Sequence, residues 1–185
     1  LNGLFAFALL DEEDPEEARR RYAKARRFGC ALLEHRELVG GPLPHGAAAM
    51  RRRLARTSRA DVDALSWAAF AWGLDGAARR GSPEALADQP LVEAILARVL
   101  ELDERHYHAL PHILLGFLFG SRTPSVGGDP ARAQKHFDAA LRLTKRRYLL
   151  THVTYAKTWA VQVQDRRRFV ELLEEVLRAP DDLDP

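Results

Sequence analysis

The spacing of apolar and polar residues predicts that this chain is built from helices. The clearest example is the segment 165–178, in which apolar residues recur at i, i+3, i+4, i+7 and i+8, the spacing of one helix face. These residues are Phe169, Leu172, Leu173, Val176 and Leu177. No segment alternates with the period of two that a half-buried strand requires. The pattern therefore predicts an all-α fold.

Further helices are predicted at 15–35, 61–80, 91–102, 107–120, 129–143 and 148–163, and 1–10 reads as the end of another. Glycine and proline at 40–44 interrupt the pattern and predict a break there. A basic stretch follows this break, before the segment 61–80.

One helix-start motif occurs twice. The series Asp-Pro-x-x-Ala-x3-aromatic-x2-Ala begins at Asp14 and again at Asp129. Aspartate is a good N-cap because its carboxylate accepts first-turn N–H groups, and proline fits the first helical position without losing a hydrogen bond. The small, aromatic and small residues fall on one face, where a neighbouring helix can approach closely. The second helix of a tetratricopeptide hairpin packs in this way.

The predicted helices pair as hairpins. Leu115-Gly116-x2-Phe119 resembles the Leu-Gly-x2-Tyr element of a tetratricopeptide first helix, and the helix after Asp129 supplies the second. The pairs 61–80 with 90–102 and 148–163 with 165–178 follow the same plan with weaker signatures. We therefore predict degenerate tetratricopeptide-like hairpins, stacked as a single domain over residues 1–185.

Charge and cysteine content narrow the function classes. The 185 residues include 28 basic and 26 acidic side chains, so the net charge is only +2. Arginines cluster at 51–59 and 166–168, but without interleaved aromatics or a nucleic-acid motif they read as solvated faces, and no nucleic-acid partner is expected. Cys30 is the single cysteine, so no intramolecular disulfide can form.

Catalytic signatures are missing from the sequence. His108 and His112 are spaced i, i+4, which on a helix can place two imidazoles on one metal, but that helix offers no further ligand after Glu104. Gly127 and Gly128 read as a tight turn that delivers the Asp129 cap, because the Lys-Ser/Thr of a phosphate-binding loop is absent. We expect no enzyme activity, no metal and no cofactor.

Two of the predicted helices are apolar on more than one side. Such helices are either sandwiched between neighbours or line a cleft, and apolar pockets between helices are common ligand sites. Aromatic rings give large contact area at low entropy cost, and one histidine would give a polar contact. The predicted lining is Trp67, Phe70, Trp72, His112, Phe117, Tyr155 and Trp159.

A set of motifs in the C-terminal half carries a family resemblance. In order, they are Pro111-His112-x-x-Leu115-Gly116, Pro124-x-x-Gly127-Gly128-Asp129-Pro130-x-x-Ala133-x3-Phe137-x2-Ala140-Leu141, Val153-x-Tyr155-Ala156 and Gln164-Asp165-x3-Phe169-x-x-Leu172-Leu173-x-x-Val176-Leu177. The earlier Leu65-x-Trp67-x-x-Phe70-Ala71-Trp72 belongs to the same set. In this order and spacing the motifs resemble the T-component (TatT family) of tripartite ATP-independent periplasmic (TRAP) transporters. The resemblance covers roughly Asp61 to Asp184 and, more loosely, the N-terminal hairpin.

The resemblance implies a periplasmic, lipid-anchored, all-helical protein that forms a trimer and docks the substrate-binding protein of the transporter. It also implies a hydrophobic cleft or pore that faces the partner, and hence a hydrophobic small ligand. The lipobox and its cysteine are not in this chain, and Cys30 lies inside a predicted helix. A signal and anchor segment is therefore expected before Leu1.

The leading hypothesis is a non-enzymatic accessory component of a periplasmic solute-uptake system. The alternative is a cytoplasmic tetratricopeptide adaptor that holds a peptide segment of a partner protein in its groove. An upstream lipoprotein signal would favour the first, and a plain initiator methionine the second. A metal-dependent hydrolase that uses His108 and His112 is a third class and would require metal in the purified protein.

Overall fold

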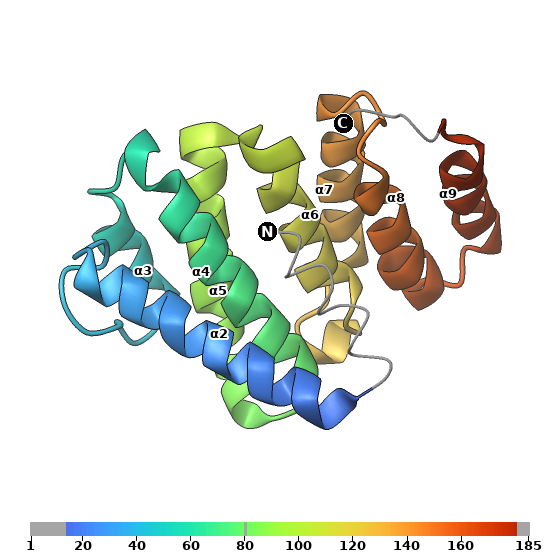
Figure 1. Cartoon of the computed structure of the whole chain (residues 1–185). Helices are drawn as coiled ribbons and strands as arrows, with labels where there is room; N and C mark the ends of the chain where they lie inside the picture. The colour runs from blue at the N-terminus through green and yellow to red at the C-terminus, as the bar shows by residue number, and fades with distance from the viewer. Residues whose placement is uncertain (1–13, 80, 181–185) are drawn as a thin grey trace. The chain divides into compact units, whose positions relative to one another are not determined.

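A computed structural model describes residues 14–79 and 81–180 (Figure 1). These residues form helices and turns and no strand, which confirms the all-α prediction. The α-helices are α2 (Pro15–His35), α3 (Ala47–Leu54), α4 (Val62–Ala78), α5 (Pro83–Asp103), α6 (His106–Gly120), α7 (Pro130–Leu143), α8 (Leu149–Tyr155) and α9 (Arg166–Arg178). Short 3-10 turns lie at Arg59–Asp61 and Pro124–Val126, and α8 continues into a π-helical turn at Ala156–Ala160. The predicted helix end at 1–10 lies outside the described residues.

Contacts along the chain divide it into two compact units, Leu1–Arg98 and Val99–Pro185, with the boundary inside α5. Each unit has its own buried side chains and is described by itself below. The prediction of a single domain over 1–185 stays a prediction.

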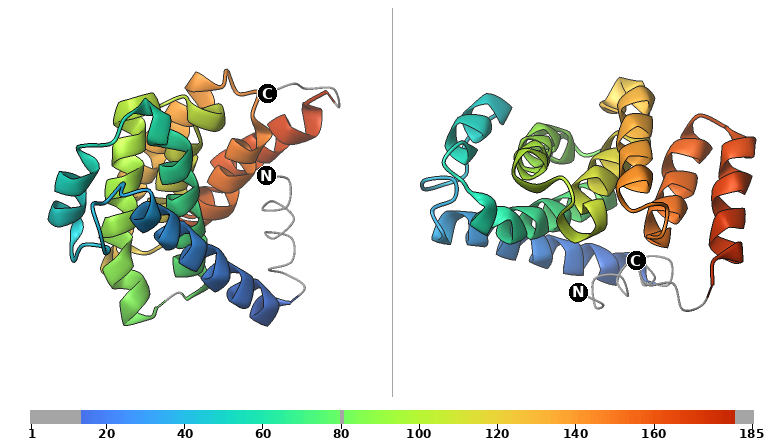
Figure 2. Two further views of the ribbon diagram at one scale, coloured as in Figure 1. Left: turned by 60° about the vertical axis from the view of Figure 1, so that its left-hand side comes forward. Right: turned by 90° about the horizontal axis from the view of Figure 1, so that it is seen from above.

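In the first unit, α2 lies along α4 (Figure 2). The Asp14 carboxylate accepts a hydrogen bond from the backbone N–H of Glu17 at 3.0 Å, so it caps α2 as the motif predicts. Ala18 and Tyr22, the next members of the motif, are buried. A Cβ atom on Gly29 would lie 3.0 Å from the Cα of Ala68, so this glycine allows the two backbones to approach closely.

A network of four charged side chains joins α2, α4 and α5 in the same unit. Asp75, only 2% exposed, accepts hydrogen bonds from Arg79 at 2.8 and 2.6 Å. Asp88 lies 2.8 Å from Arg26 and 3.3 Å from Arg79. The hydrogen bond to Asp75 raises the pKa of Arg79. Two cations and two anions thus compensate one another where three helices meet.

In the second unit, α6 and α7 form the predicted hairpin. The Asp129 carboxylate caps α7 by accepting from the N–H of Arg132 at 3.0 Å, and Ala133, Phe137 and Ala140 are fully buried. A Cβ atom on Gly116 would lie only 2.8 Å from two ring carbons of Phe137. The glycine of the first helix therefore leaves room for the aromatic ring of the second.

The tight turn before α7 is also confirmed. Gly127 has φ +85°, a conformation that glycine adopts without strain. A Cβ atom on Gly128 would collide with the backbone carbonyl of Arg122, so only glycine fits there. The two glycines therefore bring the chain back to the Asp129 cap.

The pair α8 and α9 completes the second unit, and the two helices run side by side in Figure 2. The Asp165 carboxylate caps α9 by accepting from the N–H of Arg168 at 2.9 Å. Only Leu172 of the predicted apolar face is buried, whereas Leu177 is 84% exposed. The helix is thus where the periodicity predicts it, but much of its apolar face remains open.

The structure adds helical residues that the sequence analysis left out. The basic stretch after the Gly-Pro break forms α3, and only Met50 and Leu54 of this helix are buried. Helix α5 begins at Pro83, well before the predicted start at 91, and continues through Pro90. At the start of α6, Tyr107, His108 and Ala109 have positive φ angles of 42, 56 and 60°. The predicted regular helix from 107 is therefore wrong over these three residues.

Candidate functional site

Three of the predicted cleft residues lie on α4 in the first unit. Trp72 is 2% exposed, and the Arg26 guanidinium lies 5.3 Å from the centre of its ring. The indole N–H of Trp72 is buried and has no hydrogen-bond partner among the described residues. Trp67 and Phe70 are half-buried and pack edge to face, with ring centres 5.9 Å apart. Of the three predicted cleft residues on α4, Trp67 and Phe70 are therefore the ones that remain partly open.

Tyr155 and Trp159 belong to an aromatic cluster in the core of the second unit. The Tyr155 ring stacks on Phe137 at 4.6 Å and contacts the edge of Trp159 at 5.3 Å. Tyr155 is fully buried, and this burial raises the pKa of its hydroxyl to about 12. The indole N–H of Trp159 donates to the carbonyl of Pro130 at 2.7 Å. These rings hold α7 against the turn Ala156–Ala160.

His112 pairs with His136 of α7, a residue that the sequence analysis did not single out. Their Nδ1 atoms lie 3.0 Å apart, and Nε2 of His112 lies 3.9 Å from a Glu104 carboxylate oxygen. Burial lowers the pKa of both imidazoles, that of His136 to about 4, with further lowering from the neighbouring His112. At neutral pH both rings are therefore uncharged, and one donates a hydrogen bond to the other.

His108 does not share the environment of His112. Its ring stacks on Tyr148 with centres 4.7 Å apart, and the positive φ angles at 107–109 remove the helical spacing on which the metal alternative depended. Residues 14–79 and 81–180 contain no group of three or more His, Cys, Asp or Glu side chains that could hold a metal ion.

The predicted lining is divided between the two units. His112, Tyr155 and Trp159 lie in the second unit together with Phe117, which is half-buried on α6. The seven-residue aromatic cleft remains a prediction, in which Trp72, Tyr155 and Trp159 are core residues of their own units.

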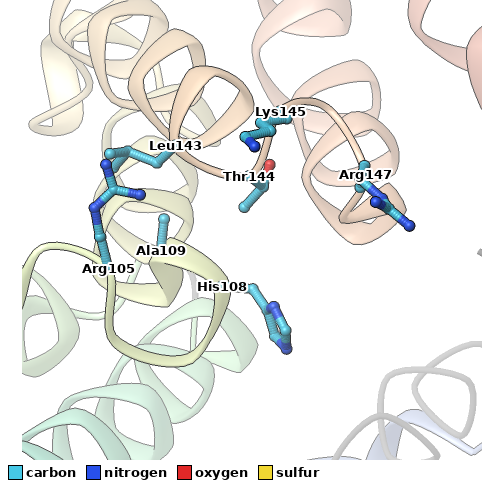
Figure 3. Close-up of a pocket in the computed structure, with 7 residues that line it drawn as sticks. All are labelled: Arg105, His108, Ala109, Leu143, Thr144, Lys145 and Arg147. Atoms are coloured by element: carbon cyan, nitrogen blue, oxygen red, sulfur yellow. The ribbon is translucent and has the colours of Figure 1, made fainter. Parts of the chain in front are cut away.

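A cleft that the sequence analysis did not predict lies in the second unit (Figure 3). Its volume is about 350 Å³, and its walls come from two segments, the start of α6 and the turn after α7. The lining residues are Arg105, His108, Ala109, Leu143, Thr144, Lys145 and Arg147. Every charged side chain among them is cationic. The basic run Lys145-Arg146-Arg147 is the one feature of the sequence that could have pointed to this cleft. Nothing in the sequence places Arg105 opposite that run.

The second unit also exposes apolar side chains around its C-terminal helix. Val161 and Val163 follow the π-helical turn and are 57% and 38% exposed, and Val170 and Leu177 of α9 are 41% and 84% exposed. Exposed apolar residues gathered in one segment are typical of a surface that contacts another protein. We refer to these four residues as the C-terminal apolar surface.

Comparison with known proteins identifies the family of the chain. The family model described as TRAP transporter T-component matches residues 8–185, nearly the whole chain. No curated protein matches the chain. None of the helices in the described part of the chain is long and apolar enough to cross a membrane.

Proposed function

The chain belongs to the TRAP transporter T-component family, and on this premise we propose that it is a non-catalytic accessory component that docks the transporter's substrate-binding protein. The observation that carries the proposal is the family match over residues 8–185. It acts in the periplasm, held by a lipid anchor on a segment before Leu1, and assembles as a trimer. An all-helical protein with an open apolar surface is suited to protein contact.

We place the docking contact on the C-terminal apolar surface. Leu177 and Val170 lie on the same helix. Both are far more exposed than apolar residues that pack into the core of their own chain. Two salt bridges flank them along α9, Arg178 with Glu174 at 2.7 Å and Arg167 with Glu171 at 2.8 Å. An apolar centre with a charged rim is the usual layout of a protein interface.

The experiment has two stages. The purified protein is first cross-linked to a cell-envelope extract from its own organism, and captured proteins are identified by mass spectrometry. Recovery of an extracytoplasmic substrate-binding protein of a TRAP transporter is the expected result. Recovery of only cytoplasmic proteins would overturn the proposal and leave a general helical-repeat adaptor.

The second stage tests the surface with purified partner. Val170→Glu with Leu177→Glu should weaken binding at least about tenfold, because two carboxylates would enter a dehydrated contact. The matched control is Phe28→Glu with Leu86→Glu, which alters two exposed apolar residues of the first unit, 61% and 38% exposed. Equal binding by both variants would show that the partner docks on another surface. The proposal that the protein docks a substrate-binding protein would still stand. Light scattering on the wild type should give three times the chain mass of 20.8 kDa.

The apolar ligand is a separate part of the proposal. Trp67 and Phe70 are the predicted lining residues of the first unit that remain half-open, so within that unit they are the ones that a ligand reaches first. Trp67→Ala should weaken binding of a fluorescent fatty-acid probe severalfold. Phe28→Ala, which removes an exposed ring elsewhere, is the control. If the probe binds wild type and both variants equally, this lining is wrong.

A further inference from the structure

The cleft between the start of α6 and the turn after α7 has no counter-charge. Its three cations are Arg105, Lys145 and Arg147, and its lining contains no carboxylate. Within the described chain, none of the three side chains forms an ion pair or a side-chain hydrogen bond with an acidic residue. Cations that line one cleft without a partner repel one another, so they are stabilised when an anion binds there.

Neighbouring acids are directed to other groups. The Asp103 carboxylate accepts from the backbone N–H of Arg105 at 3.1 Å, and Glu104 lies 3.9 Å from His112. Arg146, the middle residue of the basic turn, forms a two-pronged ion pair with Glu175 at 2.7 and 2.6 Å. The ion pair removes only the middle cation, so Lys145 and Arg147 on either side of it still line the cleft.

Backbone strain is concentrated in the two segments that form the cleft. Tyr107, His108 and Ala109 on one side, and Lys145 and Arg146 on the other, have positive φ angles between 42 and 63°. Each such residue other than glycine is in a disfavoured conformation, which persists only where surrounding contacts impose it. Strain of this kind fixes the direction of side chains and is concentrated at binding sites.

The remaining walls define the type of ligand. The His108 ring lines one side of the cleft and is held against Tyr148 at 4.7 Å, while Ala109 and Leu143 are apolar. The Thr144 hydroxyl already donates to the Ala140 carbonyl at 2.8 Å. The donors that remain are mainly cationic and suit a carboxylate or phosphate group. A volume of about 350 Å³ fits a small molecule.

We infer that this cleft binds the oxyanion group, carboxylate or phosphate, of a small soluble molecule. The inference rests on the cleft alone and is independent of the docking role, so either can fail without the other. An anionic lipid headgroup carries the same chemistry, and the experiment below separates the two sources.

The test measures binding of inorganic phosphate and of citrate to the full chain by isothermal titration calorimetry at low salt. The cleft variant is Arg105→Gln, Lys145→Gln and Arg147→Gln. The control variant is Lys24→Gln, Lys135→Gln and Arg166→Gln, which alters three exposed cations outside the cleft. Both variants lose three positive charges, so they have the same net charge. All six side chains are exposed, and circular dichroism checks that each variant is folded.

We expect saturable one-to-one binding of at least one probe to the wild type, weakened roughly tenfold or more in the cleft variant and less than about twofold in the control. An NMR titration of the His108 ring, assigned with His108→Asn, should show its resonances moving with the same dissociation constant. Absence of saturable binding to the wild type would overturn the inference. Equal weakening in both variants would also overturn it, because binding would then follow net charge alone.

Vesicles separate the lipid source from the soluble one. The same proteins are sedimented with phosphatidylcholine vesicles with and without phosphatidylglycerol. One outcome is that binding to the anionic vesicles requires the cleft cations while phosphate and citrate do not bind. That result would overturn the soluble ligand and show that the cleft binds anionic lipid headgroups at a membrane surface.

Discussion

The close fit of Gly116 against Phe137 can be tested with a single methyl group. Gly116→Ala would place a Cβ atom 2.8 Å from the Cε1 and Cζ atoms of the ring and 2.9 Å from Cδ1. Carbon atoms in contact prefer about 3.5–4.0 Å, so the ring would have to move by at least about 0.7 Å. It has little room to do so, because Phe137 is fully buried and stacked on Tyr155 at 4.6 Å.

The magnitude follows from two opposing effects. Overpacking a tight core costs about 1–3 kcal/mol, and a rigid neighbour places this site toward the upper end of that range. Replacing glycine by alanine inside a helix contributes about 1 kcal/mol of stability. We therefore expect Gly116→Ala to lower the free energy of unfolding by about 1–2 kcal/mol.

A second glycine provides the matched control. Gly73 also lies inside a helix, but its added Cβ would meet only Val92 Cγ1, at 4.0 Å, an ordinary contact. Gly73→Ala should therefore raise the free energy of unfolding by about 1 kcal/mol. Urea unfolding followed by circular dichroism measures both, as shifts in midpoint at constant slope.

A double-mutant cycle identifies the cause. In a Phe137→Leu background the ring atoms that meet the new methyl group are gone, so the cost of Gly116→Ala should fall to less than half. The reasoning is refuted if Gly116→Ala stabilises the protein as Gly73→Ala does. It is equally refuted if the cost is unchanged without the ring.

Three further predictions follow from the described contacts. Asp129→Ala should lower stability by about 1 kcal/mol in urea unfolding, because it removes the cap of α7, whereas Asp129→Asn should be nearly neutral. The pKa of His136 is about 4 in the folded chain and near 6.5, the ordinary value for histidine, in the unfolded chain, so the unfolded chain binds more protons between these values. Stability should therefore fall as pH drops from about 6.5 to about 4, by about 1–2 kcal/mol after allowance for partial exposure, and His136→Gln should flatten that slope. Asp75→Asn should cost about 2–4 kcal/mol, because Arg79 loses its buried partner, and adding Arg79→Met should recover part of the loss.

Helix starts are predictable from this sequence wherever a side-chain N-cap marks them. The aspartates before α2, α7 and α9 each accept a first-turn N–H, and these three helices begin within one residue of their predicted starts. Helix α3 has no side-chain cap, begins after a glycine with φ +81° and buries only two side chains. Local signals were too weak there, and packing against the rest of the unit supplies the helix.

The positive φ angles at Tyr107, His108 and Ala109 could not be predicted. Residues with a Cβ atom avoid this region by about 1–2 kcal/mol each, so local preference predicts a right-handed helix here. Long-range contacts reverse that preference, among them the stacking of His108 on Tyr148 at 4.7 Å. The cleft was missed for the same reason, since it joins Arg105 to residues about 40 positions away that only the folded hairpin brings near.

The same limit applies to the aromatic residues. Periodicity places Trp67 and Trp72 on one helix but does not distinguish a core residue from a cleft-lining residue. A core stripe and a ligand-facing stripe both exclude water, so they have the same pattern. The structure separates them by exposure: Trp72 is 2% exposed, whereas Trp67 is half-open. A substitution at Trp72 therefore reports mainly on stability, and one at Trp67 is the better test of binding.

Pairing, rather than the number of basic residues, distinguishes structural arginines from those available to a ligand. Arg79 is held by Asp75 and Asp88, and Arg146 by Glu175, whose pKa this contact lowers. Arg146 ties the basic turn to α9, so its removal would alter the conformation of the turn without changing the charges that line the cleft. Removal of Arg147 would change the charge and leave that tie intact. Loss of anion binding in Arg147→Gln with unchanged unfolding, and loss of stability in Arg146→Gln, would therefore be the signature of a cleft whose cations serve a ligand.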